Sequence, residues 1–234
     1  MQKSGYTLFI DADDTLWENN VYYLRSTATF CTLMSSYGVS PTVVDEALHE
    51  QEMAEVPTLG YGPDAHIAAL KSTTRNLLSG HEDIDRIAKR AQRVGRDLLS
   101  APVLLLPGVR KALGRLAHAH DLILVTKGVD RIQLDKLQRS GLGQFFSQQH
   151  VVPEKNAGIY SNLLARVGSD KRNTWMIGNS PKSDINPAIE AGLRAIYVPH
   201  SSTWRAERAP LAYPDVTAVV ERFSQLPDFF GHVS

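Results

Sequence analysis

The sequence predicts an α/β fold, in which a doubly wound, mostly parallel sheet of Rossmann-like order carries an inserted, all-helical domain. Two observations predict this fold. After Ala101-Pro102, short apolar runs alternate with helical stretches, a pattern typical of parallel strands joined by right-handed crossovers. Before that point, residues 21–99 show a helical period and no strand pattern. We therefore expect a sheet domain formed by residues 1–16 and 103–234, with residues 17–102 inserted into it.

The first predicted strand covers residues 6–10, a short apolar run rich in aromatic and β-branched side chains that stops at Asp11. Strands covered by helices on both faces are continuous apolar runs, and this run has that character. The first strand therefore belongs to the same sheet as the later ones. The later strands are predicted at 122–125, 149–152, 174–177 and 195–198, and the helices between them at 129–139, 160–167 and 184–190.

The inserted segment has the apolar spacing of packed helices. Its clearest part is 84–98, where apolar residues recur three or four positions apart and form one stripe along a helix. Ser40 followed by Pro41 is a typical helix start, and 60–63 has the glycine and proline content of a loop. We expect three or four helices here and no strand.

The composition argues against several kinds of partner. The chain has 25 basic and 25 acidic residues, so it has no net positive charge that would attract nucleic acid or an anionic membrane surface. Its single cysteine, Cys31, cannot form an internal disulfide, and no apolar run approaches the roughly 18 residues of a membrane span. We expect a cytoplasmic protein that binds neither nucleic acid nor membrane, and that holds any anion by a local site.

Polar residues with chemical potential follow the predicted strands. In open α/β sheets, ligands bind beyond the carboxyl ends of the strands, so these side chains are expected to meet at one edge. Several carboxylates at one edge need a cation, and oxygen ligands suit magnesium better than zinc. A lysine and a hydroxyl there could hold a dianion beside it. The residues in question are Asp11 and Asp13 after the first strand, Thr126 and Lys127 after the second, Lys155 after the third, and Asn179 and Asp184 after the fourth.

These motifs resemble those of the haloacid dehalogenase superfamily. Its DxDxT signature is matched by Asp11, Asp13 and Thr15, and its second and third motifs, a Ser or Thr and a Lys, by Thr126 and Lys155. The fourth motif, usually GDxxxxD, is matched by Gly178-Asn179-Ser180-Pro181-Lys182-Ser183-Asp184. Asn179 departs from the family because an amide stands where many members have a carboxylate. This removes one negative charge from the predicted metal site.

The resemblance implies a magnesium-dependent phosphatase that acts through an aspartyl phosphate. Asp11 would be the nucleophile. Asp13 would be the general acid and then the general base, which calls for a raised pKa. Thr126 and Lys155 would bind the transferring phosphoryl group. The magnesium ligands would be Asp11, the backbone carbonyl of Asp13, and Asp184, while Asn179 would coordinate through its amide oxygen or hold a metal-bound water.

The resemblance also gives the inserted helices a role, as a C1-type cap that closes over the site and selects the substrate. Lys127, Asn19 and Arg25 are further candidates for contact with the substrate, a small phosphoester. We expect a monomer or a homodimer.

Three alternative functions stay open. A 2-haloacid dehalogenase would use the first aspartate on carbon, although an acid at position 13 favours phosphate substrates. A phosphomutase or phosphotransferase would pass the phosphoryl group to a hydroxyl. A catalytically weak phosphoester-binding protein is compatible with Asn179. Elsewhere, we expect Asp14 to be solvated or to cap a helix, and the eight histidines to be solvated rather than ligands.

Overall fold

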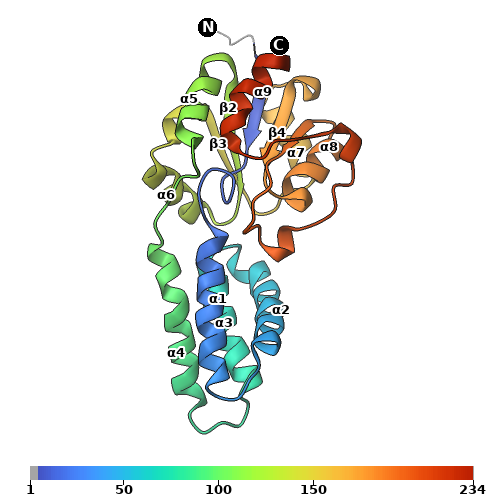
Figure 1. Ribbon diagram of the computed structural model, residues 1–234. Helices are drawn as coiled ribbons and strands as arrows, with labels where there is room; N and C mark the ends of the chain where they lie inside the picture. Colours follow the sequence, from blue (N-terminus) through green and yellow to red (C-terminus); the bar gives the residue numbers. More distant parts are fainter. Residues whose placement is uncertain (1–4, 234) are drawn as a thin grey trace. The chain divides into compact units, whose positions relative to one another are not determined.

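The computed structural model describes residues 5–233, and the chain forms two compact units (Figure 1). The first, called the α/β unit below, runs up to Asn20 and resumes at Val103. The second, called the helical unit, is Val21–Pro102. The division into a catalytic domain and a cap domain stays a prediction.

A six-stranded parallel sheet forms the centre of the α/β unit, which confirms the predicted fold class. β1 lies in its middle, and Ile10 at the end of β1 pairs with Leu124 on one side and Ile177 on the other. The last strand was not predicted from the sequence, because it is only three residues long and none of them is buried. The order is β3-β2-β1-β4-β5-β6, with β1 at Thr7–Ile10, β2 at Asp121–Lys127, β3 at Gln148–Val152, β4 at Thr174–Gly178, β5 at Arg194–Tyr197 and β6 at Thr217–Val219.

Helices cover both faces of this sheet. Alternate residues of a strand point to opposite faces, so Leu8 and Ile10 of β1 join one apolar core and Phe9 joins the other. The core that contains Leu8 includes residues of α5, α6 and α9, and the core that contains Phe9 includes residues of α7 and α8. The bounds are α5 Val109–Ala119, α6 Asp130–Ser140, α7 Ala157–Val167, α8 Asn186–Glu190 and α9 Leu226–Val233.

The helix predicted at 184–190 begins earlier than expected. A single π-helical turn, Pro181–Ile185, precedes α8, and the side chain of Ser180 accepts a hydrogen bond from the backbone nitrogen of Ser183. Isolated π-helical turns occur frequently at functional sites, where they change the direction of a side chain. Here the turn contains Asp184.

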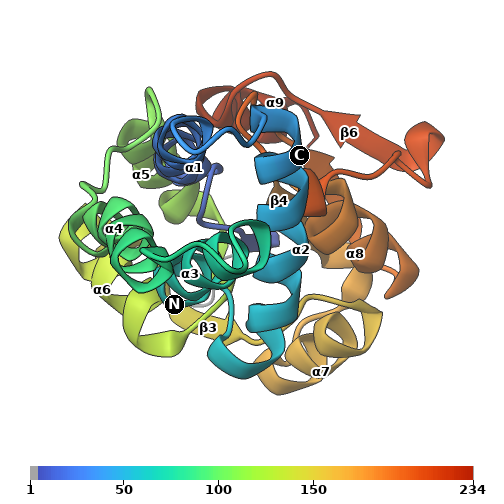
Figure 2. The same ribbon diagram turned by 90° about the horizontal axis from the view of Figure 1, so that it is seen from below.

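The helical unit consists of four α-helices, where the sequence predicted three or four. They are α1 (Asn20–Ser35), α2 (Pro41–Leu59), α3 (Pro63–Leu77) and α4 (Ile84–Arg96), with α3 lying between α2 and α4 (Figure 2). Their shared core contains Phe30, Leu48, Leu70 and Ile87, one from each helix. Burial of such side chains stabilises a bundle by about 1.5–3 kcal/mol each.

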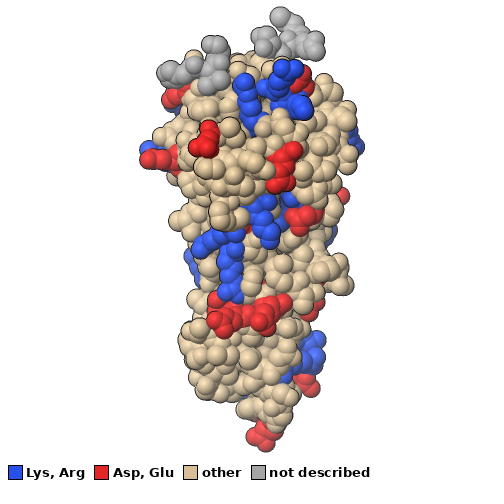
Figure 3. Space-filling view, turned by 90° about the vertical axis from the view of Figure 1, so that its right-hand side faces the viewer, with Lys and Arg blue, Asp and Glu red and all other residues tan. Residues whose placement is uncertain are grey.

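Charged side chains of both signs are interspersed on the face shown in Figure 3, as expected for a chain with no net charge. Within residues 5–233, no helix is long and apolar enough to cross a membrane.

Candidate active site

The segment after β1 is a tight loop that turns its polar side chains into the α/β unit. The backbone nitrogen of Asp11 still donates to Ile177 O at 2.9 Å, and the nitrogens of Thr15 and Leu16 both donate to Ala12 O. Asp14 has a φ of 58°, a left-handed conformation that aspartate tolerates better than most residues. The loop is fixed further by Thr15, whose hydroxyl donates to Asp11 Oδ2 at 2.8 Å.

Lys155 joins two buried carboxylates at the carboxyl edge of the sheet. Its Nζ lies 2.6 Å from Asp11 Oδ1 and 2.7 Å from Asp184 Oδ1. All three side chains are almost inaccessible to solvent, with exposed fractions of 2% for Lys155, 8% for Asp11 and 1% for Asp184. Burial alone would lower the pKa of Lys155, but the charges of the two aspartates raise it well above the usual value, so the lysine is protonated.

Asp184 is the second buried carboxylate of this cluster. Burial and the charge of Asp11 raise its pKa to about 7, although Lys155 acts in the opposite direction. The amide of Asn179 is oriented by its nitrogen, which donates to Thr203 Oγ1 at 2.9 Å, and its oxygen lies 3.4 Å from Thr15 Oγ1. The oxygens of two carboxylates and one amide therefore belong to one polar cluster. This donor set fits a hard divalent cation.

Asp13 is held on three sides. Its carboxylate accepts hydrogen bonds from Trp17 Nε1 at 2.7 Å, from Gln133 Nε2 at 3.1 Å and from Lys136 Nζ at 2.7 and 2.8 Å. Burial raises the pKa of Asp13, but the charge of Lys136 and these hydrogen bonds outweigh it and leave the pKa below the usual value. The expectation of a raised pKa is therefore wrong for this conformation.

Thr126 and Lys127, at the end of β2, have different surroundings. Thr126 is fully buried and its hydroxyl oxygen accepts a hydrogen bond from Gln133 Nε2 at 2.8 Å. Lys127 forms ion pairs with Glu207 and, at 3.3 Å, with Glu154, and its Nζ is 3.2 Å from Ser183 Oγ. Its charge is already matched by carboxylates.

The two remaining predicted contact residues, Asn19 and Arg25, belong to different units. Asn19 lies beside Asp13, because its side-chain oxygen accepts a hydrogen bond from Lys136 at 2.9 Å, and Lys136 also binds Asp13. Arg25 is exposed on α1 and belongs to the helical unit.

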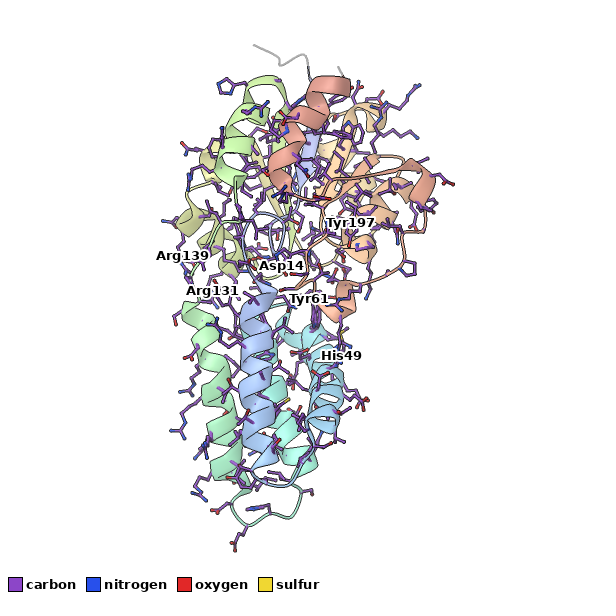
Figure 4. All side chains as sticks on the ribbon, in the orientation of Figure 1. Asp14, His49, Tyr61, Arg131, Arg139 and Tyr197 are labelled. Carbon is purple, nitrogen blue, oxygen red and sulfur yellow. The ribbon has the colours of Figure 1, made fainter. Side chains whose placement is uncertain are left out.

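Asp14 is buried, with an exposed fraction of 4%, so the expectation of a solvated side chain is wrong while that of a cap is right. Its Oδ1 accepts hydrogen bonds from the backbone nitrogens of Asn19 and Asn20, where α1 begins. Asp14 itself is labelled in Figure 4. Burial raises its pKa to about 7, although these two hydrogen bonds lower it.

A second cluster was not predicted from the sequence. Among the described residues, Asp14, Glu18 and His200 lie close enough together to share a metal ion. The ring of His200 is 3.8 Å from Asp14 and 3.6 Å from Glu18. However, Nδ1 of His200 accepts a hydrogen bond from the backbone nitrogen of Ser202, which puts the proton of a neutral ring on Nε2, the nitrogen facing Glu18. Asp14 and Nδ1 of His200 thus already accept hydrogen bonds from backbone nitrogens.

Two histidines contradict the expectation that all would be solvated. His120 is buried at the end of α5, where its Nδ1 accepts a hydrogen bond from Tyr6 N. His66 is buried inside the helical unit, with Nε2 at 2.9 Å from Ser26 Oγ and Nδ1 at 2.6 Å from Glu52 Oε1. Ser26, Glu52 and His66 come from α1, α2 and α3, so no spacing in the sequence predicts these hydrogen bonds.

A buried carboxylate, a lysine and a second carboxylate lie together at the carboxyl edge of a parallel sheet, where open α/β sheets bind their ligands. The chain belongs to the family of haloacid dehalogenase-like hydrolases, whose model matches residues 7–192. It is therefore an enzyme of the hydrolase class, as the sequence motifs predicted.

Individual relatives agree with this family. The chain is 26% identical over 229 residues to a glyceraldehyde 3-phosphate phosphatase of Methanothermobacter thermautotrophicus, covering 94% of this chain and 97% of that protein. It is 28% identical over 99 residues to the pyrimidine 5'-nucleotidase YjjG of Escherichia coli, covering 40% of this chain and 44% of that protein, which is less than half its length. A crystal structure of a haloacid dehalogenase-like hydrolase from Xanthomonas campestris has a TM-score of 0.84 and 27% identity, covering 99% of this chain and 92% of the other.

Proposed function

We propose that this chain is a magnesium-dependent phosphatase that hydrolyses a small phosphomonoester through an aspartyl phosphate on Asp11. The observation that carries the proposal is the buried cluster of Asp11, Lys155 and Asp184 at the carboxyl edge of the sheet. A cationic lysine beside a carboxylate can bind the dianion that the carboxylate attacks. Relatives named as phosphatases and nucleotidases support the same substrate class.

In the first step, a carboxylate oxygen of Asp11 attacks phosphorus and the bond from phosphorus to the ester oxygen breaks. The leaving oxygen takes a proton from Asp13. In the second step, Asp13 takes a proton from water, the water oxygen attacks phosphorus, and inorganic phosphate leaves with the carboxylate of Asp11 restored. Lys155 and the hydroxyl of Thr126 would bind the phosphoryl oxygens in both steps.

Asp13 is an anion in the described conformation, because Lys136 and Gln133 hold it. To act as an acid it must acquire a proton, and a dianionic substrate nearby would favour this because it repels the carboxylate charge. We therefore propose that the ion pair with Lys136 loosens when substrate binds.

Asp11, Asp184, Asn179 and the backbone carbonyl of Asp13 would hold the magnesium ion. When bound, the ion offsets the repulsion between the carboxylate nucleophile and the phosphate dianion. The raised pKa of Asp184, about 7, fits a site with more negative charge than Lys155 alone compensates.

The test is phosphate release from a panel of small phosphomonoesters, including para-nitrophenyl phosphate, with magnesium and with EDTA. Asp11→Asn should lose at least about a thousandfold in rate, because it removes the nucleophile. The control is Asp215→Asn, the same change at an exposed position, and it should retain full activity. Equal hydrolysis by wild type and Asp11→Asn would refute the proposal. Halide release from a 2-haloacid in EDTA would instead indicate a dehalogenase, and phosphoryl transfer to an added sugar a transferase.

A further inference from the structure

Gln133, on α6, lies among the residues of the candidate site although no motif includes it. Its side chain is buried, with an exposed fraction of 4%. Its amide nitrogen is 2.8 Å from Thr126 Oγ1, 2.8 Å from Lys127 O and 3.1 Å from Asp13 Oδ2. One side chain therefore connects the two residues to which the proposed mechanism assigns phosphate binding and proton transfer.

The orientation of this amide follows from its neighbours. The carbonyl of Lys127 and the ionised carboxylate of Asp13 can only accept hydrogen bonds, so the nitrogen of Gln133 must face them. Its oxygen, Oε1, is buried and has no hydrogen-bond partner within the described part of the chain. A flipped amide would place that oxygen against the carbonyl and the carboxylate, where the oxygens would repel one another. Leaving Oε1 without a partner therefore costs less free energy than the flip.

This arrangement also directs the proton of Thr126. A hydroxyl has one proton and two lone pairs, and the hydrogen bond from Gln133 occupies a lone pair. The amide nitrogen has two protons for three acceptors, so its hydrogen bonds to Thr126 Oγ1, Lys127 O and Asp13 Oδ2 share them. Because Gln133 approaches this hydroxyl as a donor, it cannot accept the proton of Thr126, which stays available to a ligand oxygen.

We propose that Gln133 is a positioning residue, which turns the hydroxyl of Thr126 toward a bound phosphoryl group and holds the carboxylate of Asp13 beside it. The proposal deepens the proposed function and rests on it, since it assumes a phosphoryl group at this edge of the sheet. Lys136, one turn further along α6, also binds Asp13 and contacts both of its carboxylate oxygens.

The test is a double-mutant cycle between Gln133→Met and Thr126→Val. Met has nearly the length of Gln and donates no hydrogen bond. Gln138→Met is the matched control, because Gln138 is exposed on the same helix. For each variant, kcat and KM are measured with para-nitrophenyl phosphate and magnesium, the Kd of inorganic phosphate by calorimetry, and Tm by circular dichroism.

Gln133→Met should lower kcat/KM by about 10- to 100-fold and weaken phosphate binding by about 5- to 15-fold, since a positioned hydrogen-bond donor is lost. In the Thr126→Val background the same change should weaken phosphate binding by less than about threefold, because residues that act through one another are not additive. Gln138→Met should match the wild type. Should Gln133→Met fail to fold, Gln133→Asn, which retains the amide with a shorter reach, takes its place in the cycle.

An equal loss of phosphate affinity in both backgrounds would overturn the proposal, because it would indicate a merely structural role, and so would the absence of any loss. Phosphate binding without hydrolysis by the wild type would refute only the proposed function, and the cycle in phosphate affinity would still decide the role of Gln133. If the wild type neither binds phosphate nor hydrolyses the ester, both proposals fail.

Discussion

Removal of the Lys155 charge should strongly destabilise the α/β unit. Lys155→Met would leave Asp11 and Asp184 facing each other without the cation that now lies 2.6 and 2.7 Å from them. Both carboxylates are at least nine-tenths buried, with exposed fractions of 8% and 1%, so water cannot replace the lysine without rearrangement. Breaking a buried ion pair by removing one partner costs about 3–5 kcal/mol.

The three tryptophans make this unit observable separately. Trp17, Trp175 and Trp204 all lie in the α/β unit, so tryptophan fluorescence follows its unfolding without a signal from the helical unit. A cost of about 3–5 kcal/mol corresponds to a decrease of about 6–20 °C in Tm for a chain of this size. Lys111→Met, at an exposed position of α5, should change Tm by less than about 2 °C.

A second variant identifies the cause. Asp184→Asn in the Lys155→Met background removes one of the two uncompensated charges, so it should restore at least about half of the lost free energy of unfolding. If Lys155→Met leaves Tm unchanged, or if the added Asp184→Asn destabilises the chain further, repulsion between the two carboxylates is not what the lysine prevents.

Three further predictions concern other parts of the molecule. His66→Leu should lower the free energy of unfolding of the helical unit by about 2–3 kcal/mol, because Ser26 and Glu52 lose their buried partner. Far-ultraviolet circular dichroism measures this loss, and an equally large loss in the exposed control His118→Leu would contradict the prediction. Gly178→Ala should reduce activity and lower the free energy of unfolding by about 1–3 kcal/mol, because a Cβ there would lie 2.2 Å from Asp184 Oδ2. The control is Gly114→Ala, whose Cβ would meet nothing closer than 3.8 Å, and equal effects of the two substitutions would argue against the steric reason. Glu207→Gln tests pH dependence: burial raises the pKa of Glu207, but Lys127 outweighs it and leaves the pKa below the usual value. The stabilisation is therefore present above the pKa of about 4.3 in the unfolded chain and is lost as the pH falls through the lower folded pKa, so the Tm difference between wild type and variant should be largest at pH 7 and shrink toward pH 3. A difference that does not change with pH would rule out this ion pair as its source.

The sequence by itself determined the sheet, the inserted helices and the set of residues at the strand ends. The apolar periods of strands and helices are local properties, so 174–177 could be identified as a buried strand, and Asn179 and Asp184 placed beyond its end, without any knowledge of the neighbours. The short β6 and the start of the π-helical turn were not predicted, because three residues or one turn give too little periodicity.

The tertiary structure alone decided the partners of these residues and hence their charge states. Gln133 and Lys136 reach Asp13 across more than 100 positions of the chain, and Glu207 pairs with Lys127 from a segment with no motif. A pKa depends on burial and on charges within a few ångströms, and the sequence order does not encode those distances. That is why Asp13, expected to have a raised pKa, has a lowered one, and why Asp14, expected to be solvated or to cap a helix, is a buried cap.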